Sequence, residues 1–194
     1  MNKEFDTLSD YLNTITNFPY EELEKLKLIP KIQYIKKGDY FLKEGEKPHN
    51  FAFIYQGLFR ITYLHEKGKE FTKGFFPENT FISSYSALIQ NRESHFSIEA
   101  LEDSTIIVID YNGFKKLFEN HICWHKVLIA LLEKAFCKKE EREREFLLFD
   151  AAARYENFQK EYPNLKDRIK QHVLASYLGI TPVALSNIRK IYKN

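Results

Sequence analysis

The residues whose types and spacing best suit a chemical task lie near the end of the chain, between positions 169 and 190. Ala175 is a small residue inside a helical stretch, Gly179 suits a left-handed turn, and Thr181, which precedes a proline, suits the N-cap of a following helix. Leu185 and Ile188 are spaced to face the first helix. This spacing predicts a helix-turn-helix, whose second helix enters the major groove of DNA, with an ordinary pair of packed helices as the alternative.

The second helix is expected to turn small and polar side chains toward bases and phosphates. The predicted DNA-binding residues are Thr181, Val183, Ser186, Asn187, Arg189 and Lys190, with Ala184 beside them. Six basic residues against one acid after position 165 give a net charge of +5 there and leave −3 for the rest of a chain whose total is +2. A basic tail on a near-neutral body favours an anionic partner, although a solvated terminal helix has the same composition.

The remaining residues give little support for metal binding or catalysis. His121 and His125 share a helix face, as a metal-binding pair would, but no third ligand accompanies them. The sequence also lacks a glycine-rich phosphate loop and a nucleophile elbow. We therefore predict no catalytic residue, no metal site and no enzyme activity.

The cysteines and the apolar runs indicate where the protein works. Cys123 and Cys137 do not make a disulfide framework, which favours a reducing compartment. No apolar run approaches the roughly 20 residues of a membrane span, and the polar, acidic N-terminus has no signal-peptide core. We expect a cytoplasmic protein with no membrane partner.

The elements that must position the C-terminal motif fall into two kinds. Residues 1–30 show helical spacing that ends at Pro30, and residues 32–110 form short apolar runs separated by glycine and polar clusters, with a short helix expected over 83–90. Such spacing predicts a β-sandwich or barrel. From Tyr111 the pattern is helical, including a stretch from Phe146 to Tyr162 that Pro163 ends.

The longest helix is predicted from Ile122 to about Glu145. It carries an apolar stripe that we assign to a dimer interface, made by Trp124, Val127, Leu128, Leu131, Leu132, Ala135 and Phe136. A small β domain cannot cover a helix of this length, so pairing with a second copy is favoured over packing on the chain's own β domain. The charged run 138–145 that follows predicts a solvated face with i,i+4 ion pairs.

Several segments, taken in order, form a recognisable series that covers nearly the whole chain. They are Lys37-Gly38-Asp39 with Glu44-Gly45, Tyr55-Gln56-Gly57-Leu58-Phe59-Arg60, Ile98-Glu99-Ala100-Leu101-Glu102-Asp103-Ser104, Ala153-Arg154-Tyr155 with Glu161-Tyr162-Pro163, Ala175-Ser176-Tyr177-Leu178-Gly179-Ile180-Thr181-Pro182 and Leu185-Ser186-Asn187-Ile188-Arg189-Lys190. In this series the chain resembles Crp/Fnr-type transcription regulators, in particular a short variety common in Bacteroidetes.

The resemblance implies an α+β fold with three parts. A jelly-roll-like β-roll of the cyclic-nucleotide-binding kind is expected over 1–120, a dimerisation helix over 121–145 and a helix-turn-helix domain over 146–194. It further implies a homodimer that binds palindromic promoter DNA, with RNA polymerase as a further partner.

The sequence departs from that family at the effector site. In ligand-binding members a Gly-Glu pair takes the ribose hydroxyl and a later Arg neutralises the cyclic phosphate. Here Ser83 and Ser84 stand at the Gly-Glu pair and Ser94 stands at the Arg, while Arg92 lies two residues early beside Glu93. A phosphate site without its bidentate charged donor loses the strongest part of its affinity. These four residues, Ser83, Ser84, Arg92 and Ser94, are the candidate effector pocket; we expect no cofactor, and an effector other than cAMP or none.

The recognition helix departs as well. Family members usually carry Glu and Arg where this chain has Val183 and Asn187. An Asn side chain can bind adenine through two hydrogen bonds, whereas Val offers only apolar contact, for example to a thymine methyl. We therefore expect either a target DNA sequence that differs from the one usual in the family or a loss of sequence-specific binding. Only four residues follow Lys190, so we expect the β-hairpin wing to be absent or replaced, which weakens binding.

Two functions therefore stand side by side. The first is a homodimeric DNA-binding regulator whose β-roll senses a molecule other than cAMP, or senses nothing. The second is a module that acts through a protein partner and whose helix-turn-helix is degenerate. Val183 and Asn187 favour the second hypothesis, whereas Arg189, Lys190 and the basic tail favour the first.

Overall fold

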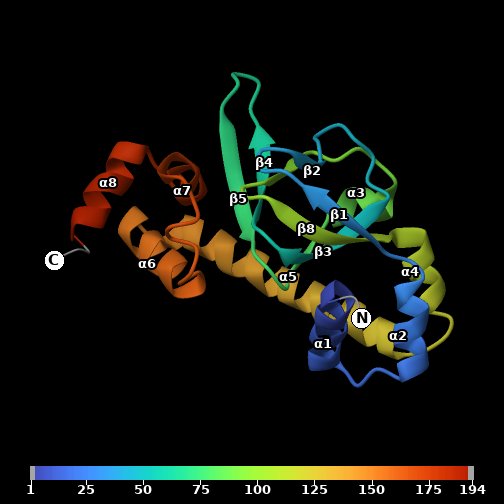
Figure 1. Ribbon diagram of the computed structural model, residues 1–194. Coiled ribbons are helices and arrows are strands. Elements are labelled where there is room, and N and C mark those ends of the chain that lie inside the picture. Colours follow the sequence, from blue (N-terminus) through green and yellow to red (C-terminus); the bar gives the residue numbers. More distant parts are fainter. Residues whose placement is uncertain (1–2, 192–194) are drawn as a thin grey trace. The chain divides into compact units, whose positions relative to one another are not determined.

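The computed structural model describes residues 3–191, which contain both helices and strands (Figure 1). The α+β class predicted from the sequence is confirmed. The chain divides into two compact units, one made of residues 1–63 and 75–133, the other of residues 64–74 and 134–194. The three-part division predicted from the resemblance stays a prediction.

Two four-stranded sheets form the β-roll. Their strands run in the orders β1-β8-β3-β6 and β2-β7-β4-β5, and all the pairs with a defined register are antiparallel. The strands are β1 Lys31–Ile35, β2 Tyr40–Leu42, β3 Asn50–Gln56, β4 Phe59–Leu64, β5 Glu70–Phe76, β6 Phe81–Ile82, β7 Ser97–Ala100 and β8 Ser104–Asp110.

Alternation along the strands places the core of the roll. In β3, Ala52 and Ile54 are buried in the cluster between the sheets, whereas Phe53 is buried in a second cluster with the helices. Strand β8 repeats the pattern, with Ile106 in the first cluster and Ile107 in the second. This sheet is therefore covered on both faces, which explains why its strands form continuous apolar runs in the sequence.

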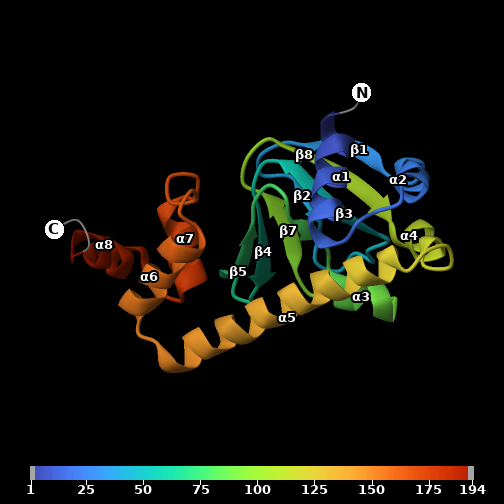
Figure 2. The ribbon, with the colours of Figure 1, turned by 90° about the horizontal axis from the view of Figure 1, so that it is seen from below.

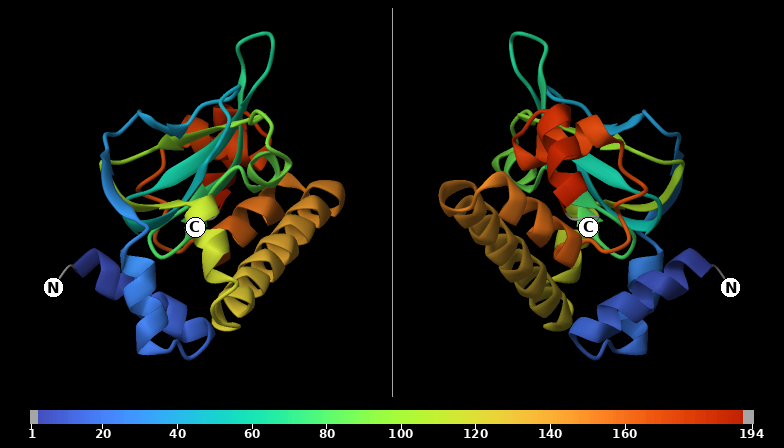
Figure 3. Two further views of the ribbon diagram at one scale, coloured as in Figure 1. Left: turned by 90° about the vertical axis from the view of Figure 1, so that its right-hand side faces the viewer. Right: turned by 90° about the vertical axis from the view of Figure 1, so that its left-hand side faces the viewer.

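The helices of the first unit build that second cluster. They are α1 Lys3–Ile15, α2 Tyr20–Lys27, α4 Tyr111–Leu117 and the beginning of α5 Cys123–Leu148, while α3 Tyr85–Gln90 lies between β6 and β7 in the sequence. Figure 3 shows the two N-terminal helices, in blue, beside the first turns of α5. Leu8 and Leu12 of α1 pack there with Trp124 and Val127 of α5. The N-terminal segment thus fixes where α5 begins.

The second unit contains the rest of α5 together with α6 Ala151–Glu161, α7 Gln171–Leu178 and α8 Pro182–Ile191. Helix α5 runs unbroken to Leu148, as Figure 2 shows. The prediction of a new helix starting at Phe146 is therefore wrong. The break falls at Asp150, whose carboxylate accepts a hydrogen bond from the Ala153 N–H at 2.8 Å and caps α6.

Two further differences from the predicted elements are local. Strand β6, with only two residues, was too short to leave a pattern and follows Asn79, whose φ is 59°. The short helix expected from Ser83 begins at Tyr85. Within residues 3–191, no helix combines the length and the apolar character that crossing a membrane requires.

Candidate nucleic-acid interface and effector site

The turn between α7 and α8 has the geometry that its sequence predicts. Gly179 caps α7 in the left-handed conformation, with φ of 70°. The N–H of Ile180 donates to the carbonyl of Ala175 at 3.0 Å. The N–H of Gly179 donates to the carbonyl of Ser176 at 3.1 Å. These two bonds satisfy the last carbonyls of α7 and turn the chain sharply toward α8.

A side chain at Gly179 would also meet a neighbour. A Cβ built there lies 2.9 Å from Cε1 of Phe146, near the end of α5. The glycine is therefore required for two separate reasons, its backbone conformation and the close approach of an aromatic ring.

The start of α8 is held by its own residues and by α7. The Thr181 hydroxyl accepts from the Ala184 N–H at 3.2 Å, as an N-cap does, and Pro182 occupies the first helical position. Nε2 of Gln171 donates to the carbonyl of Pro182 at 2.9 Å. Ala175 and Leu185 are fully buried. The predicted helix-turn-helix spacing thus produces two closely packed helices.

The outer face of α8 is formed by Val183, Asn187 and Lys190, which follow one another at i, i+4 and i+7 and are all exposed, with Val183 at 70%. Ser186 is half-buried beside them, and Thr181 is exposed at the cap. Part of the predicted contact set is therefore brought together on one surface.

Arg189 differs from the prediction that placed it on that outer face. Its guanidinium carbon lies 5.9 Å from the ring centre of the buried Tyr155 in α6. Among the described residues, its Nε is buried and has no hydrogen-bond partner. The reason is helical geometry: Arg189 follows the buried Leu185 by four residues, which is only about 40° around the helix.

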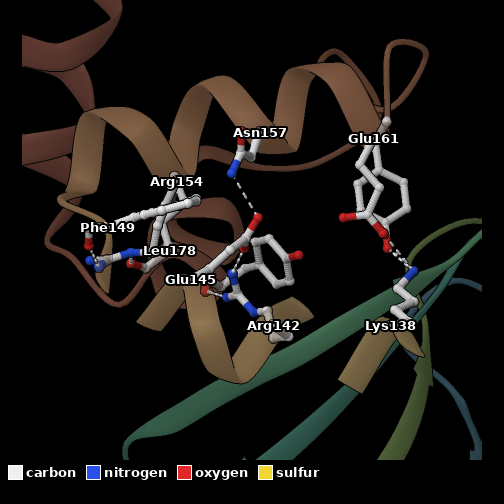
Figure 4. A network of polar contacts seen from close by, with 10 residues as sticks. Lys138, Arg142, Glu145, Phe149, Arg154, Asn157, Glu161 and Leu178 are labelled. Atoms are coloured by element: carbon white, nitrogen blue, oxygen red, sulfur yellow. Dashed lines mark hydrogen bonds and ion pairs between the residues drawn. The ribbon is translucent and has the colours of Figure 1, made fainter. Parts of the chain in front are cut away.

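A polar network joins the last turns of α5 to α6 and α7 (Figure 4). The Arg142 guanidinium pairs with Glu145 at 3.2 Å, lies 3.7 Å from the Tyr177 ring centre and donates to the Tyr177 carbonyl. Glu145 in turn accepts from Nδ2 of Asn157 at 3.0 Å. A guanidinium at the carbonyl end of α7 also suits the helix dipole.

The same network continues at both of its ends. Lys138 pairs with Glu161 at 2.9 Å and donates to the Tyr162 hydroxyl, while Nε of Arg154 donates to the Leu178 carbonyl at 3.1 Å. Burial raises the pKa of Tyr162 and of Tyr177, so both phenols stay neutral. The prediction that 138–145 forms only a solvated face is therefore wrong, although Lys139 and Glu143 do make an i,i+4 pair at 3.5 Å.

Ser176 links α7 to strand β5. Its hydroxyl accepts from the Thr72 N–H at 2.9 Å and donates to the Glu70 carbonyl at 3.1 Å. Sequence analysis assigned no contact to Ser176, Arg142 or Arg154, because most of their partners are backbone atoms or lie at least 24 positions away. Ser176 and Arg154 were marked in advance only as parts of family-like segments.

The candidate effector residues form a closed polar contact. The hydroxyl oxygens of Ser84 and Ser94 lie 2.9 Å apart, and that of Ser94 is also 2.8 Å from the Phe96 carbonyl. Both serines are 1% exposed. The positions that carry Glu and Arg in ligand-binding relatives are thus occupied by two small hydroxyls that satisfy one another.

Ser83 and Arg92 lie apart from that pair. The Ser83 hydroxyl donates to the Asn50 carbonyl at 3.4 Å. Asn91 is left-handed, with φ of 50°, and ends α3, which leaves the Arg92 side chain exposed. Arg92 is therefore exposed to solvent and takes no part in the Ser84–Ser94 contact.

The N-terminal part of α5 packs on its own chain. Trp124 is 0% exposed, and its indole N–H donates to Glu22 of α2 at 2.7 Å. Burial raises the pKa of Glu22, but hydrogen bonds from Lys25 and Trp124 outweigh that effect and lower it overall. The assignment of Trp124 to a dimer interface is corrected: within this chain it is a core residue.

The exposed apolar stripe of α5 is shifted from the predicted one. Leu131 packs against the core of the first unit, Leu128 is half-buried, and Leu132 and Ala135 are exposed. The exposed stripe repeats with heptad spacing. It begins at Ile122, just before α5, and continues with His125, Ile129, Leu132 and Phe136. The predicted stripe combined residues of this exposed face, such as Leu132 and Phe136, with residues of the core face, such as Trp124 and Val127.

The histidines and cysteines serve other contacts. His125 stacks on Phe118 with ring centres 4.9 Å apart, and Nδ1 of His121 accepts from the Cys123 N–H at 3.2 Å. Over residues 3–191 no three His, Cys, Asp or Glu side chains gather in a way that suits a metal ion. Cys123 is buried, where desolvation raises its thiol pKa, and Cys137 is exposed.

Part of the chain matches a known protein family. Residues 32–121 match the cyclic nucleotide-binding domain family. No curated protein sequence is similar enough to serve as a relative.

Solved structures extend the likeness along the chain. FixK2 from Bradyrhizobium japonicum is similar with a TM-score of 0.73 and 15% identity, covering 84% of this chain and 83% of that chain. The c-di-GMP responsive global regulator CLP from Xanthomonas campestris is similar with a TM-score of 0.72 and 13% identity, and the match covers 90% of this chain and 92% of that chain. A protein from Eubacterium rectale assigned to the Crp/Fnr family is similar with a TM-score of 0.72 and 14% identity, and the match covers 95% of this chain and 88% of that chain.

The fold and these matches agree on what the chain resembles. Residues 32–121 match the cyclic nucleotide-binding domain family, and the chain has a fold like that of solved Crp/Fnr transcription regulators. The resemblance seen in the sequence is confirmed to that extent.

Proposed function

We propose that the protein is a homodimeric, sequence-specific DNA-binding transcription regulator. The observation that carries the proposal is the exposed face of α8, where Val183, Asn187 and Lys190 stand on a helix fixed by a capped start and a glycine turn. Exposed side chains at the start of the second helix are those that reach base edges in a helix-turn-helix. The basic tail supplies attraction to phosphates.

The proposal of a homodimer rests on α5. Ile129 and Phe136 are 55% and 65% exposed, and they lie seven residues apart on the exposed stripe. Two identical stripes related by a two-fold axis bury each other, which removes apolar side chains from water and places two recognition helices on one duplex. The expected target is therefore a palindrome.

For the effector domain we propose that cAMP is not bound in the usual way, and that no cofactor is required. The bond between Ser84 and Ser94 supports this, because neither hydroxyl can neutralise a phosphate. The likeness of this chain to CLP, which is described as c-di-GMP responsive, does not show that this chain binds c-di-GMP.

The test is selection of duplexes from a random pool by the purified full chain, followed by anisotropy titration of the enriched sequences at two salt concentrations. Enrichment of a two-fold-symmetric site that binds more weakly at higher salt would support the proposal. Added cAMP should leave the affinity unchanged; a cAMP-dependent increase would contradict the statement about the effector.

The alternative is a module that acts through a protein partner, with a helix-turn-helix that no longer binds DNA. Val183 favours it, because an apolar residue stands exposed where relatives of this kind usually carry a charged one. The absence of both an enriched duplex and salt-sensitive binding would select this alternative.

A further inference from the structure

We propose that α8 reads A·T base pairs, with Asn187 contacting an adenine and Val183 contacting a thymine methyl group in each half-site. The inference rests on the proposed DNA-binding function and deepens it, because it names the chemistry of the base pairs that lie under the recognition helix.

The first step is the placement of the two side chains. Val183 lies in the first turn of α8 and Asn187 lies one turn later, so both project from the same exposed face. Asn187 is exposed, and among the described residues no hydrogen bond engages its side-chain amide. That amide is therefore available as a paired donor and acceptor, the pattern that matches N7 and the N6 amino group of adenine.

The second step is the absence of side chains that read G·C. Helix α8 has the sequence PVALSNIRKI, which contains no Asp or Glu to accept from the cytosine amino group. Its arginine, Arg189, lies with the guanidinium over the ring of Tyr155, away from the outer face. Lys190 remains exposed, but it lies at the far end of the helix, where side chains meet the phosphate backbone.

The third step is the apolar surface of Val183. With 70% of this residue exposed, α8 presents branched methyl groups to the groove. The thymine C5-methyl is the one apolar group that a base offers there, and its contact removes both surfaces from water. Asn187 and Val183 thus favour the two bases of A·T pairs.

The experiment changes single atoms in the selected duplex. In one duplex the thymines under α8 are replaced by deoxyuridine, which lacks the methyl group, and in another the adenines are replaced by 7-deazaadenine, which lacks N7. For the wild-type protein we expect roughly four-fold weaker binding with deoxyuridine, from the burial value of one methyl group, and about ten-fold weaker binding with 7-deazaadenine.

The matched variants are Val183→Ala and Asn187→Ala, both at exposed positions where alanine keeps the helix. Val183→Ala should bind the thymine and deoxyuridine duplexes alike while still distinguishing adenine from 7-deazaadenine, and Asn187→Ala should show the reverse. Glu140→Ala, at an exposed position of α5 outside the predicted DNA-binding set, should respond to both base changes as the wild type does. Circular dichroism melting of each variant verifies that α8 is intact.

The outcomes separate the two proposals. An enriched palindrome with G·C pairs under α8, or salt-sensitive binding that ignores both base changes, would overturn the A·T inference and leave the DNA-binding function standing. Absence of any salt-sensitive binding to duplex DNA would overturn the proposed function, and the inference with it.

Discussion

Replacement of Gly179 by alanine perturbs the turn of the helix-turn-helix in two ways that can be separated. The residue has φ of 70°, a conformation that costs an L-residue roughly 1–2 kcal/mol, partly offset by the lower entropy of the unfolded alanine chain, about 0.4–1 kcal/mol. The new Cβ also lies 2.9 Å from Cε1 of Phe146, so the ring must shift. We expect a total loss of about 2 kcal/mol.

The chain offers a matched control for the first effect. Gly68 has φ of 76°, and a Cβ built there meets nothing within 4 Å. Gly68→Ala should therefore cost only the net conformational penalty, about 0.5–1 kcal/mol. The difference between the two variants reports the contact with Phe146, and Phe146→Ala in the Gly179→Ala background should remove most of it.

The assay is urea unfolding of the three variants and of Phe146→Ala alone, followed by tyrosine fluorescence and by circular dichroism. The affinity for the selected duplex is measured beside it. Equal destabilisation by Gly179→Ala and Gly68→Ala would refute the steric part of the reasoning. A Gly179→Ala protein as stable as the wild type would refute both parts.

Three further perturbations test other contacts. Ser176→Ala removes two hydrogen bonds to β5, should cost about 1–2 kcal/mol and should speed amide hydrogen exchange in residues 65–74, whereas Ser186→Ala should not; unchanged exchange would speak against the link. Glu22→Gln should lower the unfolding free energy at pH 7 by about 1.5–3 kcal/mol. Because the pKa of Glu22 is lowered in the native state, the wild type should lose this advantage as the pH falls below about 4.3, and the variant should not; parallel pH profiles in urea unfolding would contradict it. Ile129→Asp should convert a dimer to a monomer in light scattering while Lys134→Asp leaves the mass unchanged, and an unchanged mass for Ile129→Asp would exclude the exposed stripe as the interface.

The parts of the fold that follow local rules could be predicted from the sequence. Gly179, Thr181 and the proline after it mark a turn and a helix start through the conformations and bonds of single residues, and the structure has them where the sequence places them. Strand β8 was visible as an apolar run because both of its faces are buried. The end of α5 was misplaced, since a polar and charged run gives no sign of where a helix stops until the cap at Asp150 is recognised.

The parts that depend on tertiary contacts could not be predicted. Nothing local in Trp124 shows that α2 covers it, so its assignment to an exposed stripe failed. Ser84 and Ser94 were identified as substitutes for charged residues, but their bond to each other joins two segments that only the folded roll brings together. Arg189 is different, because its position relative to Leu185 follows from helical spacing and was available from the sequence.

Three consecutive residues at the end of α7 are each held by a different element. Ser176 binds β5, the carbonyl of Tyr177 binds Arg142 of α5, and the carbonyl of Leu178 binds Arg154 of α6. Because α8 is joined to α7 by the packed turn, the position of its outer face follows from all three anchors. A change in the last turns of α5 would therefore move the outer face of α8 through the Arg142 guanidinium and the last turn of α7. In the roll, Ser84 and Ser94 bond to each other and neither carries a charge. For the regulator that we propose, these contacts favour control through α5 and its proposed pairing over control through a bound nucleotide.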